Sequence, residues 1–180
     1  MNLWHGVAKD RIHPEKFIAC IEITKESKMK YELDKQTGAL ILDRVLHTAT
    51  HYPANYGFIP LTYGGDNDPL DVLVLCQGAI VPMTLVECYP IGVVKMIDQD
   101  EIDEKIIAIA CHDPFWNGYQ DIQELPAHLF DEITHFYNVY KVLEGKKTHV
   151  EEILGKNDAM KIIAKAIQDY QKKFGNTQIK

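Results

Sequence analysis

The segment "YGGDNDPLDV", residues 63–72, places three carboxylates directly in front of an apolar run of strand length. Asp66, Asp68 and Asp71 lie within six residues, and the run "LDVLVLC" at 70–76, which includes Asp71, is typical of a buried strand. Carboxylates a few Å apart disfavour each other's ionisation. The fold must therefore either leave this turn in solvent or bring positive charge among the aspartates.

Asp, Asn, Pro and the preceding glycines are common turn formers, so a plain turn is one interpretation. An EF-hand calcium loop is excluded, because it needs an oxygen ligand fifth, Gly sixth and Glu twelfth. Counting from Asp66 gives Leu70, Asp71 and Gln77 at those positions. A loop counted from Asp98 fails in the same way. The aspartates also precede the strand, which argues against a covalent aspartyl phosphate.

A cluster of hard divalent cations that serves a phosphate substrate is the remaining alternative to the plain turn. It predicts further carboxylates and cations, and the sequence offers both. Lys30 with Glu32, and Asp103 with Lys105, are two residues apart and share a strand face. Each pair alone is also typical of a solvated face, so only their combination favours the site. The other candidates are Glu22, Arg44, Asp98, Tyr140 and Lys141, the last two expected side by side in a helix.

The pattern along the chain predicts a mainly β protein, with helices near the C-terminus. Expected strands cover 17–23, 30–33, 39–45, 70–76, 86–98 and 105–110, with a hairpin turn at "DKQTG" and an acidic connection "DQDEIDE". A helix is expected after Pro126, and a last one capped by Asn157 with Gly175 beyond its end. We predict one domain, residues 1–180, built as a closed or nearly closed antiparallel barrel.

Composition excludes several classes of protein. The net charge of −7 argues against nucleic-acid binding, which for a barrel needs a basic groove. No apolar run is long enough to span a bilayer, and the first residues do not resemble a signal peptide. The four cysteines lack metal-site spacing and are expected as buried thiols in a reducing cytoplasm. The aromatic segment 112–122 is expected to be a packing or subunit-contact loop.

Several motifs together resemble the family I soluble inorganic pyrophosphatases, in particular their short bacterial-type members. They are "DNDPLDV", "IEI" at 21–23, "KYE" at 30–32, "GALILDR" at 38–44, "YPANYGFIP" at 52–60, "IGVVKMID" at 91–98, "DEK" at 103–105 and "HFYNVYK" at 135–141. The resemblance implies an OB-like, five-stranded barrel flanked by helices. It implies Mg²⁺-dependent hydrolysis of pyrophosphate to two phosphates, several ions per site with Mn²⁺ as a possible substitute, and a homohexamer.

The same resemblance implies roles for individual residues. Asp68, in the middle of the triplet, would be the general base that acts on a metal-activated water. The implied metal ligands are Asp66, Asp71, Asp98, Asp103 and Glu32, with Glu22, Tyr52 and Asn55 in supporting positions. The implied phosphate-binding residues are Lys30, Arg44, Tyr56, Lys105, Tyr140 and Lys141. These cations would neutralise the charge of pyrophosphate and so allow water to attack.

One position departs from the family pattern. Asp98 is followed by Gln99 where many members carry Glu, which predicts weaker binding of a substrate-side metal and a higher Mg²⁺ requirement. The neighbouring Asp100 and Glu101 could compensate for the missing charge. A non-catalytic member would be expected to lose Asp68, Asp71 or Lys30, and this chain keeps all three. A broader phosphoanhydride hydrolase remains an alternative.

Overall fold

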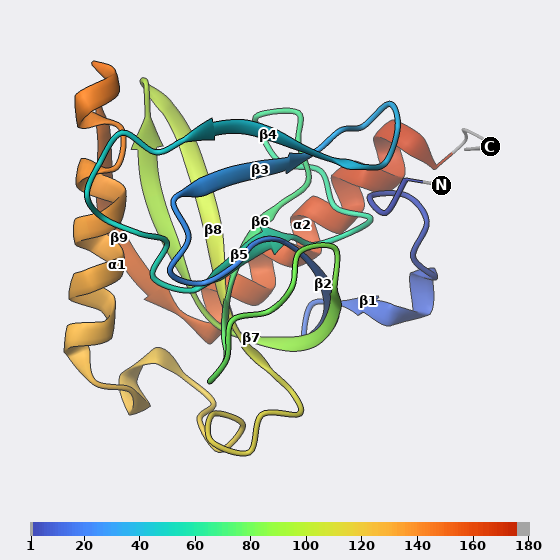
Figure 1. Ribbon diagram of the computed structural model, residues 1–180. Helices are drawn as coiled ribbons and strands as arrows, with labels where there is room; N and C mark the ends of the chain where they lie inside the picture. The colour runs from blue at the N-terminus through green and yellow to red at the C-terminus, as the bar shows by residue number, and fades with distance from the viewer. Residues whose placement is uncertain (1, 176–180) are drawn as a thin grey trace.

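A closed ring of five strands forms the centre of the molecule in the computed structural model, which describes residues 2–175 (Figure 1). In ring order the strands are β2 (Lys16–Ile23), β5 (Asn55–Phe58), β6 (Asp71–Leu75), β8 (Glu101–Ala110) and β7 (Leu85–Asp98). The ring closes because β2 pairs with β5 on one side and with β7 on the other. The expected barrel is therefore confirmed.

The barrel is not wholly antiparallel, which corrects one detail of the expectation. Strands β6 and β8 pair in parallel, with Asp71 opposite Lys105, whereas the other four pairs are antiparallel. The long strand β7 follows β6 in the chain and pairs with β8 through a hairpin. Two consecutive reversals of direction bring β8 back beside β6 with the same polarity.

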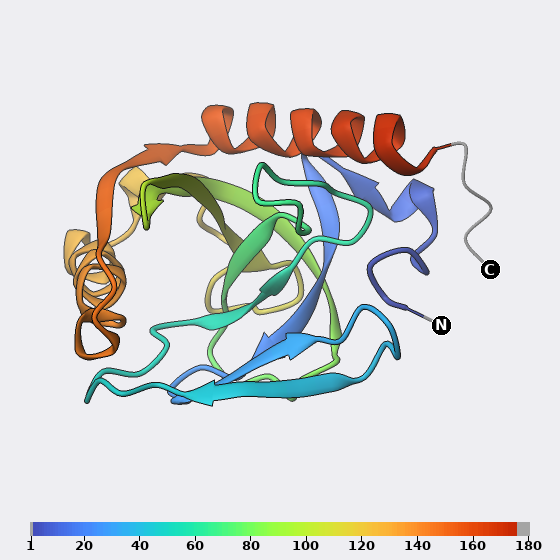
Figure 2. The ribbon, with the colours of Figure 1, turned by 90° about the horizontal axis from the view of Figure 1, so that it is seen from above.

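Several elements surround the ring. They are η1 (Lys9–Arg11), β1 (Ile12–His13), the hairpin β3 (Met29–Leu33) and β4 (Leu40–Val45), η2 (Ile122–Glu124), α1 (Ala127–Val139), η3 (Val142–Glu144), β9 (Thr148–Gly155) and α2 (Lys156–Phe174). Figure 2 shows α2 along one side of the barrel and the β3–β4 hairpin along the opposite side. The start of the described part of the chain lies near the end of α2 in both views, where the Trp4 and Phe174 ring centroids are 5.4 Å apart.

Several sequence-based assignments of strands, turns and helix ends need correction. Strands β5 and β9 were not predicted, since β5 is short and β9 carries charged residues on an exposed face. The acidic connection is only a two-residue turn, in which Gln99 and Asp100 adopt φ of 51° and 72°. Helix α2 begins at Lys156 after Gly155, so Asn157 is not its cap. Helix α1 ends at Val139, which leaves Tyr140 and Lys141 just beyond it.

Alternation along the central strands divides the interior into two apolar clusters. Val72 and Val74 of β6 pack in the cluster beneath α2, whereas Leu73 and Leu75 pack in the cluster beneath α1. Ile106 and Ile107 of β8 divide in the same way. This burial on both faces explains why the run 70–76 is continuously apolar rather than alternating.

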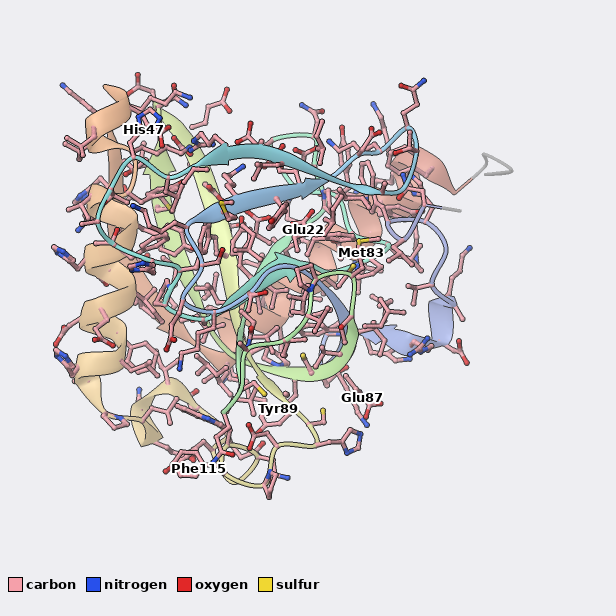
Figure 3. The ribbon with its side chains drawn as sticks, viewed as in Figure 1. Glu22, His47, Met83, Glu87, Tyr89 and Phe115 are labelled. Carbon is pink, nitrogen blue, oxygen red and sulfur yellow. The ribbon has the colours of Figure 1, made fainter. Side chains whose placement is uncertain are left out.

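The expectations about the four cysteines and the aromatic loop 112–122 are partly confirmed. Cys20 and Cys88 are buried and Cys76 and Cys111 half-buried, and all four are free thiols. In the loop 112–122, Trp116 and Tyr119 pack against the cluster beneath α1, while Phe115 is 62% exposed at the edge of the molecule (Figure 3). Between residues 2 and 175, no helix is both long and apolar enough to cross a membrane.

Candidate active site

A cavity of about 200 Å³ opens between the barrel wall and the β3–β4 hairpin. Twelve residues expected at the site line this cavity: Glu22, Lys30, Glu32, Tyr56, Asp66, Asp68, Asp71, Asp98, Asp103, Lys105, Tyr140 and Lys141. Glu22 lies in the middle of the molecule beneath the hairpin (Figure 3). Residues 119 positions apart in the chain, from Glu22 to Lys141, therefore converge on one cavity.

Lys105 stands at the centre of the barrel wall and is only 3% exposed. The parallel register of β6 and β8 places it opposite Asp71, and its Nζ lies 2.7 Å from that carboxylate. Asp103, two residues earlier on the same face, lies 2.9 Å away, and Tyr56 accepts a third hydrogen bond at 3.3 Å. Burial disfavours the ammonium, but Asp103 and Asp71 outweigh it and hold the pKa of Lys105 well above its usual value.

Three carboxyl groups of the cavity have pKa values above their ordinary range. Burial raises the pKa of Glu22 to about 8, against the opposing hydrogen bond that it accepts from the Leu33 N–H at 2.7 Å. Burial also raises the pKa of Asp103, and burial together with the charge of Asp103 raises that of Asp66. Seven carboxyl groups and four lysines line the cavity, so cations that enter it would favour the ionised form of these buried carboxyls.

The loop between Tyr63 and Leu70 turns its carboxylates toward the cavity through its own hydrogen bonds. The Gly64 N–H donates to the Asp68 carbonyl at 2.7 Å, and the Asp68 N–H donates to Asp66 Oδ1 at 3.1 Å. Asn67 completes the turn with a φ of 69°. A Cβ on Gly64 would lie 3.0 Å from Asp66 Oδ1, so a larger residue there would press on that carboxylate.

Cations of the hairpin and of the segment after α1 complete the cavity. Lys30 forms an ion pair with Glu32 and lies 3.4 Å from Asp43, and Lys141 forms an ion pair with Asp98. The expectation that Lys30 and Glu32 share a strand face is confirmed. Lys141 is 9% exposed, although it lies outside the helix in which it was expected.

Arg44 does not line the cavity. Its Nε donates to the carboxylate of Glu144 at 3.0 Å, and its Nη1 donates to Asp43 at 2.5 Å. Its Nη2 is buried and has no hydrogen-bond partner among the described residues. Arg44 is paired across the hairpin with Lys30, so it lies near the cavity while its guanidinium is directed elsewhere.

Tyr52 and Asn55 also lie outside the cavity lining. Tyr52 is 2% exposed, and its ring centroid lies 5.3 Å from that of Tyr56, which does line the cavity. Asn55 is fully buried, and its Oδ1 accepts the N–H groups of Lys25 at 3.0 Å and Ile80 at 2.9 Å. Tyr52 therefore packs behind a residue of the cavity, whereas the contacts of Asn55 hold the loops around Lys25 and Ile80.

Six residues that line the cavity were not among the predicted site residues: Trp4, Tyr31, Leu33, Lys35, Phe58 and Pro69. Of these, Lys35 carries a charge, and Trp4 lies next to its ammonium. Lys35 forms an ion pair with Asp68, and its Nζ lies 5.5 Å from the centroid of the Trp4 ring. Lys35 is one of many lysines in a Lys-rich chain, and Trp4 lies far from the acidic motifs in sequence. No local pattern connects these two residues with the site.

The donor set of the cavity fits a hard divalent cation. Among residues 2–175, no three side chains of His, Cys, Asp or Glu are arranged as a metal site. The reason is that the carboxylates of Asp71, Asp98, Asp103, Asp68 and Glu32 are directed at lysines. The available ligands are nevertheless carboxylate oxygens throughout, which suit Mg²⁺ or Mn²⁺ and not a thiolate-seeking metal.

The sequence profile of the inorganic pyrophosphatases matches residues 19–171 of this chain. Soluble inorganic pyrophosphatase 2 of Chlamydomonas reinhardtii is 44% identical over 172 residues, which are 95% of this chain and 89% of the relative. Soluble inorganic pyrophosphatase 1 of Arabidopsis thaliana is 43% identical over 93% of this chain and 79% of its own length.

Solved structures of inorganic pyrophosphatases have the same fold as this chain. The inorganic pyrophosphatase of Thermus thermophilus superposes with a TM-score of 0.91 at 36% identity, over 95% of this chain and 99% of the other. That of Helicobacter pylori superposes with a TM-score of 0.85 at 44% identity, over 88% and 95% respectively. With the profile match and this fold, the chain belongs to the inorganic pyrophosphatase family.

Proposed function

We propose that this chain hydrolyses inorganic pyrophosphate to two orthophosphates with the help of divalent metal ions, Mg²⁺ above all. The observation that carries the proposal is the single cavity in which seven carboxylates and four lysines meet. Membership of the pyrophosphatase family supports the choice of substrate. A cavity of about 200 Å³ also suits a small anion better than a nucleotide.

The lysines supply the contacts for the two phosphate groups in this proposal. Lys30, Lys105 and Lys141 are already positioned by ion pairs, so they present charge to the substrate at little further cost in side-chain entropy. The hydroxyl groups of Tyr56 and Tyr140 are hydrogen-bond donors in the same cavity. Arg44 would join them by exchanging its contact with Glu144 for a phosphate oxygen.

The carboxylates divide between metal binding and proton transfer. Asp66, Asp71, Asp98, Asp103 and Glu32 would hold the ions, with Glu22, Tyr52 and Asn55 in support. When bound, Mg²⁺ neutralises phosphate charge and lowers the pKa of a coordinated water.

Asp68 would be the general base and would accept a proton from the attacking water at a carboxylate oxygen. Its side chain is 48% exposed and belongs to the turn at the mouth of the cavity. A carboxylate with this access to solvent can return the proton to bulk water after each turnover. Asp66 and Asp71 stand beside it in sequence and would fix the position of the water.

We extend the proposal to the whole chain as one domain, residues 1–180, that acts in the cytoplasm as a homo-oligomer, with a hexamer favoured. Exposed apolar side chains on β4 and after α1 support assembly: Ile41, Leu42, Val45, Val142 and Leu143. Sedimentation equilibrium tests the hexamer, which requires the mass of six chains. A monomer at micromolar concentration would contradict it.

The direct test of the activity is phosphate release from pyrophosphate with Mg²⁺, with Mn²⁺ and with a chelator, using ATP as the control substrate. We expect rapid release from pyrophosphate with Mg²⁺, no release with the chelator, and little release from ATP. Equal rates on ATP would favour a broader phosphoanhydride hydrolase. No release from folded protein with either metal would overturn the proposal.

A further inference from the structure

Lys35 lines the same cavity as Lys30, Lys105 and Lys141, although it lies outside the family motifs. It lies in the hairpin turn directly after β3, and its ammonium forms an ion pair with the carboxylate of Asp68. Both side chains are 48% exposed. An ion pair this exposed is weak, so a multiply charged anion competes for the ammonium effectively.

Trp4 is a platform for the Lys35 side chain. The ammonium lies 5.5 Å from the ring centroid of Trp4, within the range of a cation–π contact. Trp4 itself is 5% exposed and fixed, because its Nε1 donates to the Thr62 carbonyl at 2.8 Å and its carbonyl accepts the Leu61 N–H at 2.9 Å. The Trp4 ring is thus a fixed surface beside the ammonium at the mouth.

The backbone of Lys35 is held as well. The Asn2 side chain donates to the Lys35 carbonyl at 2.7 Å. The N-terminal segment therefore contacts Lys35 twice, through Asn2 at its backbone and through Trp4 at its ammonium. The other lysines of the cavity are less accessible, with side chains 17% exposed for Lys30, 4% for Lys105 and 11% for Lys141. Lys35 is therefore the cation that an incoming anion meets first.

We propose that Lys35 is a further substrate-binding residue, which exchanges its contact with Asp68 for a phosphate oxygen of pyrophosphate while Trp4 keeps it within reach. The exchange leaves the Asp68 carboxylate free to accept a hydrogen bond from water as the substrate binds. This inference rests on the proposed function. It makes the N-terminal segment part of the substrate site, although that segment carries none of the family motifs described above.

Steady-state kinetics with Lys35→Gln, Lys35→Arg and the control Lys16→Gln test the inference. Lys16 is a matched control, because it is also exposed and pairs with a carboxylate, Glu87 at 3.0 Å, outside the cavity. Loss of one charged phosphate contact predicts a KM for pyrophosphate about tenfold higher in Lys35→Gln, with a smaller change in kcat. Arg keeps the charge and stacks on aromatic rings, so Lys35→Arg restores most of the affinity.

Trp4 fluorescence gives a readout that does not depend on turnover. In a Trp116→Phe background Trp4 is the sole tryptophan, and methylenediphosphonate with Mg²⁺ serves as a non-hydrolysable probe. We expect Trp116 to tolerate this change, because its Nε1 is buried without a hydrogen-bond partner among the described residues. We expect the probe to change Trp4 emission as the ammonium leaves the ring, and Lys35→Gln to abolish that change.

The two proposals fail in different ways. If the unmodified chain releases no phosphate from pyrophosphate, the proposed function fails and the role of Lys35 fails with it. If the unmodified chain is active and Lys35→Gln keeps its KM, or keeps the full emission change, only the role of Lys35 is overturned. A rise in KM for Lys16→Gln equal to that for Lys35→Gln would also overturn it.

Discussion

The two sides of the cavity are built in different ways. On the barrel wall, Lys105, Asp71 and Asp103 have side chains that are 4%, 23% and 19% exposed, and neighbouring strands hold them side by side. At the mouth, Lys35 and Asp68 come from a hairpin turn and a loop, and each is 48% exposed. The wall is fixed by the fold, whereas the mouth is held by weak contacts that a substrate can exchange.

The difference shows which part of the site the fold itself must specify. A buried ammonium with two carboxylates is stable only while all three remain together, because removal of one leaves uncompensated charge. An exposed pair loses little when it separates, because water solvates both groups. The substrate is therefore expected to separate the pair at the mouth easily, whereas the wall contacts would be exchanged only when cations and phosphate replace each other's partners.

The largest expected effect on stability comes from Lys105→Met. We expect the free energy of unfolding, measured with urea in the presence of chelator, to fall by about 3–5 kcal/mol. The reason is that Asp71 and Asp103 would face each other without their shared cation. Lys35→Met is the matched change at the mouth, with an expected loss below about 1 kcal/mol. Equal losses in the two variants would remove the distinction between wall and mouth.

A second effect depends on pH and comes from Glu22, which is 7% exposed beside the wall. Its folded pKa of about 8 exceeds the unfolded value of about 4.3, so the folded state retains a proton that the unfolded state has lost. Its stabilising contribution is present below the unfolded pKa and is lost as pH rises through the folded pKa.

Chelator-treated protein should therefore show a free energy of unfolding that falls between about pH 5 and about pH 8 because of this group. Glu22→Gln keeps an oxygen that can accept the Leu33 N–H but cannot ionise, so its stability should depend less on pH in this range. Urea unfolding at several pH values measures both slopes. Parallel slopes for the two proteins would mean that Glu22 ionises normally.

The smallest expected effect belongs to Gln99→Glu, at the exposed turn beyond the wall. The Gln99 Nε2 lies 3.4 Å from Asp98 Oδ1, and Gln99 does not line the cavity. An added exposed charge should lower the Mg²⁺ concentration for half-maximal activity by about twofold to fivefold. Gln120→Glu, also at an exposed position, is the control. An unchanged Mg²⁺ requirement would show that the departure from the family pattern has no consequence.

Local sequence patterns predict the wall better than the mouth. Asp103 and Lys105 share a strand face by simple alternation, and the strand that follows the aspartates is a continuous apolar run. Alternation places each pair on one face but does not bring the motifs together; their convergence on one cavity was expected from the resemblance to the pyrophosphatase family. The short strand β5 and the charged strand β9 could not be predicted from the sequence, because neither has a clear apolar period.

Contacts between distant segments account for what sequence reasoning missed. The guanidinium of Arg44 is directed at Glu144, 100 residues later, and no local pattern could indicate this. The same holds for Lys35, which lies between Trp4 and Asp68. The direction of a side chain in a loop depends on its tertiary neighbours. Motifs can therefore identify the residues of a site, but they do not predict where those side chains point.

Asp68→Asn tests the central claim most directly, because it removes the proposed base and preserves the shape of the turn. We expect kcat for pyrophosphate to fall by about 10²–10⁴-fold, with the free energy of unfolding within about 1 kcal/mol of the unmodified chain. Asp169→Asn, which removes an α2 carboxylate paired with Lys165, should keep full activity. An Asp68→Asn protein that keeps the kcat of the unmodified chain would contradict the assignment of Asp68 as the base.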